Sequence, residues 1–217
     1  MTGKPESARP GLASLRQAST DSRAVQSYYD DLAARYDDTL AQWQYRAPDD
    51  VSALLAPHLA EEARVLDIGC GTGLLGKALR GRGAWVIDGI DISAASLEQA
   101  GQRGCYARLM RQDLQRLPLP VPDAAYDAAA LVGVMSYIED ADALLRDLCR
   151  SVRLGGMIAF TQRTDFWQER DFPALIARLE QDGLWTAQHI STPQDYIPGH
   201  EDFTEEIKVI HVLCMVC

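Results

Sequence analysis

The sequence predicts an α/β fold: a doubly wound, mostly parallel sheet with helices on both faces. Two observations support this class. Short apolar runs alternate with segments of helical period along most of the chain, as successive strand–helix units do. A glycine-rich turn, Gly69–Gly73, joins the first apolar run to a helical segment. At 217 residues, the chain has the length of one domain with a sizeable core.

The N-terminal part of the chain changes character at about residue 22. Met1–Asp21 is rich in Ser, Pro, Gly and Arg and has no apolar segment, so we expect a disordered arm. Ser22–Trp43 has apolar residues close to helical period and predicts one or two helices, and Val51–Leu59 predicts another. We therefore expect an arm (1–21) and a domain (22–217) whose first part, 22–60, is helical.

The first strand and the turn after it are typical of a ligand site. The run Val65–Ile68 is apolar except for Asp67, as in a strand covered on both faces. The glycines that follow have no Cβ, so a ligand can lie against bare backbone and face the N–H groups of the next helix. These glycines are Gly69, Gly71 and Gly73.

Two classes of ligand are compatible with such a turn. Dinucleotide dehydrogenases use Gly-x-Gly-x-x-Gly, which Gly71, Gly73 and Gly76 fit loosely. Asp67 argues against a dinucleotide, because a carboxylate at the end of the strand would repel a pyrophosphate. A ligand that carries positive charge suits this position better.

A second acid stands where a ribose would be bound. The apolar run Trp85–Ile87 leads to Asp91, at the separation expected for an acid at the end of the second strand. A carboxylate there accepts hydrogen bonds from both ribose hydroxyls, and Ile92 would pack on an adenine. Asp88 is the competing acid, and its mid-strand position predicts a partly solvated edge.

The remaining apolar runs complete the predicted sheet. Cys105–Met110 is the third strand, and Asp113 follows it as a third acid in register. Leu154-Gly155-Gly156 predicts a turn into the fifth strand. Four later strands are expected at Tyr126–Val132, Met157–Gln162, Trp185–Ile190 and Ile207–Val216. Helices are expected at Ala141–Val152 and Phe172–Gln181.

The segment Asp67-Ile68-Gly69-Cys70-Gly71-Thr72-Gly73 resembles the first motif of class I S-adenosylmethionine-dependent methyltransferases. The resemblance implies a Rossmann-like, seven-stranded sheet of order 3-2-1-4-5-7-6 with the last strand antiparallel. It also implies S-adenosyl-L-methionine as cofactor, with S-adenosyl-L-homocysteine as product. The ammonium and sulfonium groups of S-adenosyl-L-methionine suit an acid at Asp67. The implied cofactor residues are Tyr29, Tyr36, Arg46, Asp67, Gly69, Cys70, Gly71, Gly73, Asp91, Ile92, Asp113, Leu114 and Val132.

The same resemblance gives individual roles. Asp113 would bind the adenine amino group, and the backbone of Leu114 a ring nitrogen. Tyr29 and Tyr36 would cover the donor, where an aromatic face attracts a sulfonium; plain core packing is the alternative. Arg46 would bind the methionine carboxylate, or lie on the surface.

Further segments resemble one subgroup, the Williams-Beuren-region methyltransferases (the methyltransferase-like protein 27 group). These are Tyr29–Asp37, Tyr45–Pro48, Thr161–Thr164 and Asp195–Gly199. Leu154 departs from the pattern, which usually has proline before Gly-Gly. Membership of this subgroup does not name an acceptor.

The residues that touch the acceptor are left open. Tyr137 leaves the fourth strand beside the expected methyl group and either lines the acceptor pocket or packs at a helix entry. Arg163 leaves the fifth strand and either holds an acceptor carboxylate or pairs with Asp165 or Glu169. His200 lies in the long connection before the last strand.

Composition restricts partners and compartment. The net charge of −10 disfavours a nucleic-acid substrate, and there is no apolar run of the length of a membrane span. The five cysteines suggest reduced thiols in a cytoplasmic setting. Cys214-x-x-Cys217 has zinc spacing but lies in an apolar run, which favours core packing and implies no metal.

The sequence therefore predicts a cytoplasmic monomer or homodimer that methylates a small molecule by in-line transfer. In such a reaction the protein mainly aligns donor and acceptor and excludes water. The alternatives are a protein methyltransferase and a non-catalytic S-adenosylmethionine-binding regulator or scaffold.

Overall fold

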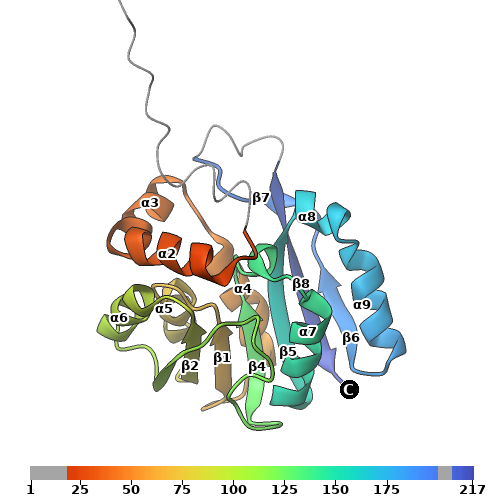
Figure 1. Cartoon of the computed structure of the whole chain (residues 1–217). Helices are drawn as coiled ribbons and strands as arrows, with labels where there is room; N and C mark the ends of the chain where they lie inside the picture. Colours follow the sequence, from red (N-terminus) through yellow and green to blue (C-terminus); the bar gives the residue numbers. More distant parts are fainter. Residues whose placement is uncertain (1–18, 200–206) are drawn as a thin grey trace, which may run out of the picture.

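The computed structural model describes residues 19–199 and 207–217, and it contains the expected α/β sheet (Figure 1). Its strands follow the order β3-β2-β1-β4-β5-β8-β6. The strands are β1 (Arg64–Ile68), β2 (Val86–Asp91), β3 (Arg108–Arg111), β4 (Tyr126–Leu131), β5 (Val152–Arg163), β6 (Trp185–Ile190), β7 (Gln194–Asp195) and β8 (Lys208–Val216).

The sheet has eight strands rather than the seven expected. β8 takes the place of the predicted seventh strand, between β5 and β6 and antiparallel to both. The additional strand, β7, has two residues and pairs with β8 outside the main order. The strands from β3 to β5 pair in parallel. The predicted order and the antiparallel last strand are therefore confirmed, with one short addition.

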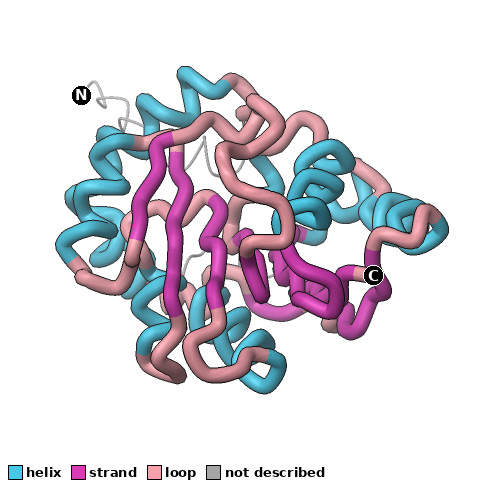
Figure 2. Tube along the Cα trace, turned by 90° about the horizontal axis from the view of Figure 1, so that it is seen from below, coloured by secondary structure: helices cyan, strands magenta, loops and turns pink. Residues whose placement is uncertain are grey.

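Helices cover both faces of the sheet (Figure 2). On one face Leu144 and Leu175 join the larger apolar core, and on the other Val51 and Leu79 join the smaller one. The first face carries α7 (Ala141–Ser151) and α9 (Phe172–Gln181). The second carries α4 (Ala47–Leu55), α5 (Leu74–Arg80) and α6 (Ala94–Gln102). Right-handed crossovers that run from β1 to β2 to β3 place α5 and α6 on the same face.

The N-terminal helices lie over the ends of the strands (Figure 1). Asp21 caps α2 (Ser22–Leu32), because its carboxylate accepts the N–H groups of Arg23 and Ala24. A 3₁₀ turn, Ala33–Arg35, leads into α3 (Tyr36–Gln42). This confirms the two helices expected from Ser22–Trp43. The predicted arm lies outside the described residues, except for residues 19–21.

The remaining short elements connect these layers. Two 3₁₀ turns follow α4 and β4, and the short helix α8 follows β5. Their bounds are Ala56–His58, Met135–Tyr137 and, for α8, Thr164–Glu169.

Three local expectations are wrong. β3 begins at Arg108, three residues after its predicted start. The predicted turn at Leu154-Gly155-Gly156 lies inside β5 as an irregularity, where Gly155 has a φ of 72° and the register with β4 shifts. Asp88 is 3% exposed, because it accepts a hydrogen bond from Tyr126 and pairs with Arg64.

Candidate active site

The glycine turn between β1 and α5 is the floor of the site. Gly69, Gly71 and Gly73 have φ angles of 66°, 52° and 90°, which L side chains rarely adopt. A Cβ at Gly71 would meet nothing within 4 Å, so this part of the turn faces open space. Asp91 holds the turn from β2: its carboxylate accepts the N–H of Gly71 at 2.8 Å and the N–H of Ser93 at 2.8 Å.

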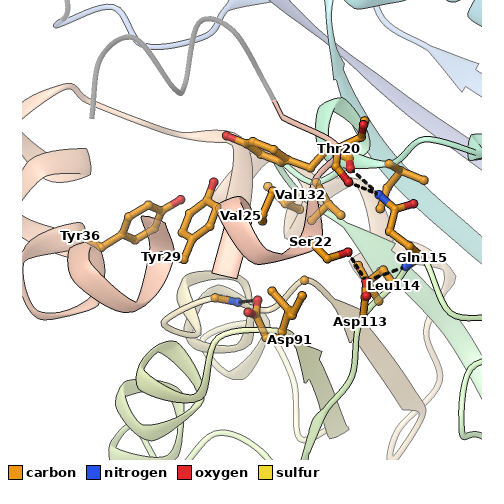
Figure 3. A pocket seen from close by; sticks show the side chains of 17 residues that line it. Thr20, Ser22, Val25, Tyr29, Tyr36, Asp91, Asp113, Leu114, Gln115 and Val132 are labelled. Atoms are coloured by element: carbon orange, nitrogen blue, oxygen red, sulfur yellow. Dashed lines mark hydrogen bonds between the residues drawn. The ribbon is translucent and has the colours of Figure 1, made fainter. Parts of the chain in front are cut away.

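A cavity of about 90 Å³ lies between this floor and the N-terminal helices (Figure 3). Ten residues singled out in the sequence line it. They are Tyr29, Tyr36, Gly69, Gly71, Asp91, Ile92, Asp113, Leu114, Val132 and Tyr137.

A second, smaller cavity adjoins the first beside the end of β1. The two share lining residues, among them Gly71 and Val132, and the second adds Asp67 and Cys70. Asp67 is 1% exposed, and burial raises its pKa to about 7. Burial also raises the pKa of the Cys70 thiol, so this cysteine stays protonated.

Polar contacts attach the N-terminal helices to the floor. The hydroxyl of Ser22 donates to Asp113 at 2.9 Å, and that of Ser93 donates to Asp30 at 2.6 Å. The hydroxyl of Thr72 donates to Asp37 at 2.6 Å, and Arg103 forms an ion pair with the same carboxylate. We call residues 22–42 the cover and these contacts its latches.

Tyrosines form the inner surface of the cover. The ring of Tyr29 meets those of Tyr36 and Tyr137 edge to face, with centroids 5.9 and 5.8 Å apart. Burial raises the pKa of all three hydroxyls above that of free tyrosine. They therefore stay protonated near neutral pH and act as hydrogen-bond donors or apolar surface, not as bases.

Some expected site residues lie elsewhere. The Arg46 side chain is 76% exposed, lies 3.9 Å from Asp50 one turn along α4, and is outside both cavity linings. Gly73 caps α5 and packs against Arg103 and Tyr106 instead of lining a cavity. The exposed position of Arg46 follows from its place as the N-cap of α4.

The two other acceptor candidates also differ from Tyr137. Arg163 is 4% exposed and pairs through two nitrogens with Asp165, and Phe166 lies 4.9 Å below its guanidinium. Of its two predicted partners, the structure shows Asp165. His200 lies outside the described residues.

Several residues of the site were missed from the sequence. Gln115 links the segment before α2 to the turn after β4, because its amide donates to the carbonyls of Thr20 and Tyr137. Arg170 donates to three carbonyls in the turn that carries Tyr137, those of Met135, Ser136 and Ile138. Their sequence neighbourhoods carry no motif, so no sequence pattern points to them.

Comparison with known proteins gives the family. A model of the methyltransferase domain matches residues 65–156, from β1 to the start of β5. Human methyltransferase-like protein 27 is 35% identical over 164 residues, which are 73% of this chain and 66% of that protein. The malonyl-[acyl-carrier protein] O-methyltransferase of Serratia marcescens is 31% identical over 69% of this chain and 59% of that protein. The chain belongs to the class I S-adenosylmethionine-dependent methyltransferases.

The fold of this methyltransferase-family chain is shared more widely. The crystal structure of the [4+2]-cyclase SpnF superposes with a TM-score of 0.70 at 18% identity, over 92% of this chain and 97% of that one. The chain spans about two thirds or less of the length of the two curated relatives named above. Within residues 19–199 and 207–217, no helix is long and apolar enough to cross a membrane.

The residues of the two cavities fit the family's cofactor, S-adenosylmethionine. The bare turn at Gly71 leaves room for a ligand, and Asp91, Ile92 and Asp113 line the larger cavity where an adenosine group would lie. Asp67 lines the smaller cavity, where a buried carboxylate suits an ammonium. In the described part of the chain there is no cluster of side chains suited to a metal ion.

Proposed function

We propose that this protein transfers a methyl group from S-adenosylmethionine to a small molecule. The observation that carries the proposal is the closure of the pocket by a tyrosine-lined cover directly over the glycine turn (Figure 3). Tyr29 and Tyr36 come from the cover, and Tyr137 comes from the turn after β4. Such a covered, largely apolar site suits a small acceptor better than an exposed side chain of another protein.

In this proposal, the floor holds the cofactor. Asp91 would bind the ribose, Asp113 and Leu114 the adenine, and Asp67 the ammonium group. When bound, the cofactor supplies a methyl group already activated on its sulfonium. The chain then has to align the two reactants and keep water away. In this proposal, the latches between cover and floor fix the alignment, and burial of the pocket excludes water.

Tyr29, Tyr36 and Tyr137 would act by position and not by taking a proton. Because their pKa values are raised, they remain neutral and can donate to an acceptor or pack on it. Arg170 holds the turn of Tyr137 through its three carbonyl contacts, so this tyrosine has a fixed place in the pocket. Tyr137 is therefore our candidate for the acceptor contact.

Charge also favours a small acceptor over a nucleic acid. The chain carries 31 acidic residues against 21 lysines and arginines, so its overall field repels phosphate backbones. The same net charge disfavours a strongly acidic protein as acceptor.

The test uses S-adenosylmethionine with a labelled methyl group and a cell extract separated into small-molecule, protein and nucleic-acid fractions. We expect the label in the small-molecule fraction, and much less of it with Asp91→Asn at the same protein concentration and a limiting concentration of cofactor. Label confined to protein would contradict the proposal and establish a protein methyltransferase. No transfer to any fraction, with the cofactor still bound, would favour a second candidate: a cofactor-binding protein with another role, as the shared fold of a [4+2]-cyclase shows that this sheet occurs outside methyltransferases.

A further inference from the structure

Tyr106 lies in the segment before β3, partly buried beneath the glycine turn. Its hydroxyl donates to the carboxylate of Asp67 at 2.7 Å and accepts the backbone N–H of Gly76 at 3.2 Å. Because the Gly76 amide can only donate, the proton of the hydroxyl is directed to Asp67. One hydroxyl thus joins the buried acid of β1 to the first turn of α5, where the N-cap glycine offers no side chain.

The glycine turn is shaped around this ring. A Cβ at Gly73, Gly76 or Gly89 would come too close to the ring of Tyr106. Gly76 does not have a positive φ, so its backbone does not need glycine. The ring of Tyr106 gives the reason for a glycine there, inside a short helix.

We propose that Tyr106 is a positioning residue, which holds Asp67 in place and in its charged form for the ammonium group of the cofactor. The inference rests on the proposed function and deepens it. Asp67 lines the smaller cavity, and the hydroxyl of Tyr106 donates to its carboxylate. Tyr106 itself lines neither cavity, so its hydroxyl acts on the cofactor through Asp67.

The groups around Asp67 make its charge sensitive to this hydrogen bond. Burial and the carboxylate of Asp91 raise its pKa, the hydrogen bond from Tyr106 lowers it, and the net result is a pKa of about 7. An ammonium group binds the carboxylate and not the protonated acid. Other titratable or charged groups close to the cavity or the turn are the Cys70 thiol, the hydroxyls of Tyr36 and Tyr45, and the Arg103–Asp37 ion pair.

The chain contains a matched control pair. Tyr126 donates to the buried carboxylate of Asp88 at 2.9 Å, so it repeats the chemistry of Tyr106 and Asp67 on neighbouring strands. Neither Tyr126 nor Asp88 lines either cavity. Tyr126→Phe therefore removes the same kind of hydrogen bond without touching the proposed cofactor site.

The experiment measures S-adenosylhomocysteine binding by calorimetry from pH 5.5 to 8.5. The wild type should bind more weakly as the pH falls below about 7, where Asp67 becomes protonated. Tyr106→Phe should bind about tenfold more weakly than wild type near pH 6, the effect of losing one hydrogen bond to a charged group. The gap should close toward pH 8.5, where the carboxylate is charged in both proteins.

Two further variants decide the interpretation. Tyr126→Phe should follow the wild-type curve, and Asp67→Asn should bind weakly with no dependence on pH. In the Asp67→Asn background, Tyr106→Phe should have no further effect, since the two residues act as one unit. This cycle also separates a positioning role from a loss of folding, because a folding defect would persist in the double variant.

Wild-type and Tyr106→Phe curves that differ by the same factor at every pH would overturn the inference and leave Tyr106 as a packing residue. No binding of S-adenosylhomocysteine to the wild type at any pH would overturn the proposed function, and this inference with it. The two failures are therefore distinguishable.

Discussion

The floor and the cover of the pocket are built in different ways. The floor consists of buried strand ends and a glycine turn, held by backbone N–H groups that donate to Asp91. The cover is held by side chains, and none of the residues of α2 is fully buried. From this difference we propose that the floor binds the cofactor, whereas the cover can separate from it and selects the acceptor.

The largest expected effect comes from a substitution in the floor and is a loss of cofactor affinity. Asp91→Asn replaces an acceptor of two N–H groups by an amide whose NH₂ faces one of them, and it removes the charge offered to the ribose. We expect S-adenosylhomocysteine affinity to fall by about 1.5–3 kcal/mol, or about 10- to 150-fold, the scale of charge-assisted hydrogen bonds. Calorimetry measures it, with Asp88→Asn as the control on the same strand. Equal losses in both variants would remove Asp91 from the cofactor site.

We also expect Asp67, buried in the floor, to lower the folding stability of the protein at neutral pH. Asp67 has a raised pKa in the folded protein, so the folded state binds its proton more tightly than the unfolded chain does. Folding stability therefore falls as pH rises from about 4 to about 7, and Asp67→Asn escapes this loss. Relative to wild type, we expect the variant to gain about 2–3 kcal/mol between pH 5 and pH 8, at 1.36 kcal/mol for each unit of pKa. Urea unfolding at the two pH values measures it; an unchanged difference would show that Asp67 titrates normally.

A smaller effect should separate the cover from the floor. Tyr29→Leu removes an aromatic face from the pocket, which matters for a sulfonium and not for a neutral sulfur. We expect the preference for S-adenosylmethionine over S-adenosylhomocysteine to fall by about 0.5–2 kcal/mol, or about 2- to 30-fold. Tyr28→Leu is the control for packing, since the ring of Tyr28 meets that of Tyr29 edge to face but does not line the pocket. The same ratio in both variants would assign Tyr29 to core packing.

The smallest effect concerns a latch. Asp37→Ala removes the acceptor of Thr72 and the partner of Arg103, but its side chain is 44% exposed, so water screens part of the interaction. We expect hydrogen exchange in the cover to rise about fivefold, corresponding to about 1 kcal/mol. Asp38→Ala, one residue further on the exposed side of α3, should change nothing. Faster exchange in the floor as well would contradict a separable cover.

The same contrast explains what the sequence could predict. Asp67 and Asp91 lie at the ends of strands and Asp113 lies just after one, so local pattern places all three at one edge of the sheet. The contact of Ser22 with Asp113 joins residues 91 positions apart, and no periodicity encodes such a pair. Its existence depends on how the cover docks.

The errors have the same origin. The mid-strand position of Asp88 predicts a partly solvated edge. That prediction is wrong because the burial of Asp88 depends on Tyr126, a residue 38 positions away. For Arg46 the sequence leaves a cofactor contact and a surface position open, and the structure has this N-cap residue of α4 exposed beside Asp50. The predicted third strand includes Tyr106, which in fact packs against α5. The glycine at position 76, within a helix, is consistent with a large side chain packed there.

The most direct test of the account is a calorimetric titration of the wild-type protein with S-adenosylmethionine and, separately, with NAD. The buried acid at Asp67 and the bare turn at Gly71 lead us to expect one site for S-adenosylmethionine and no binding of NAD. Binding of NAD without binding of S-adenosylmethionine would contradict the account at its centre.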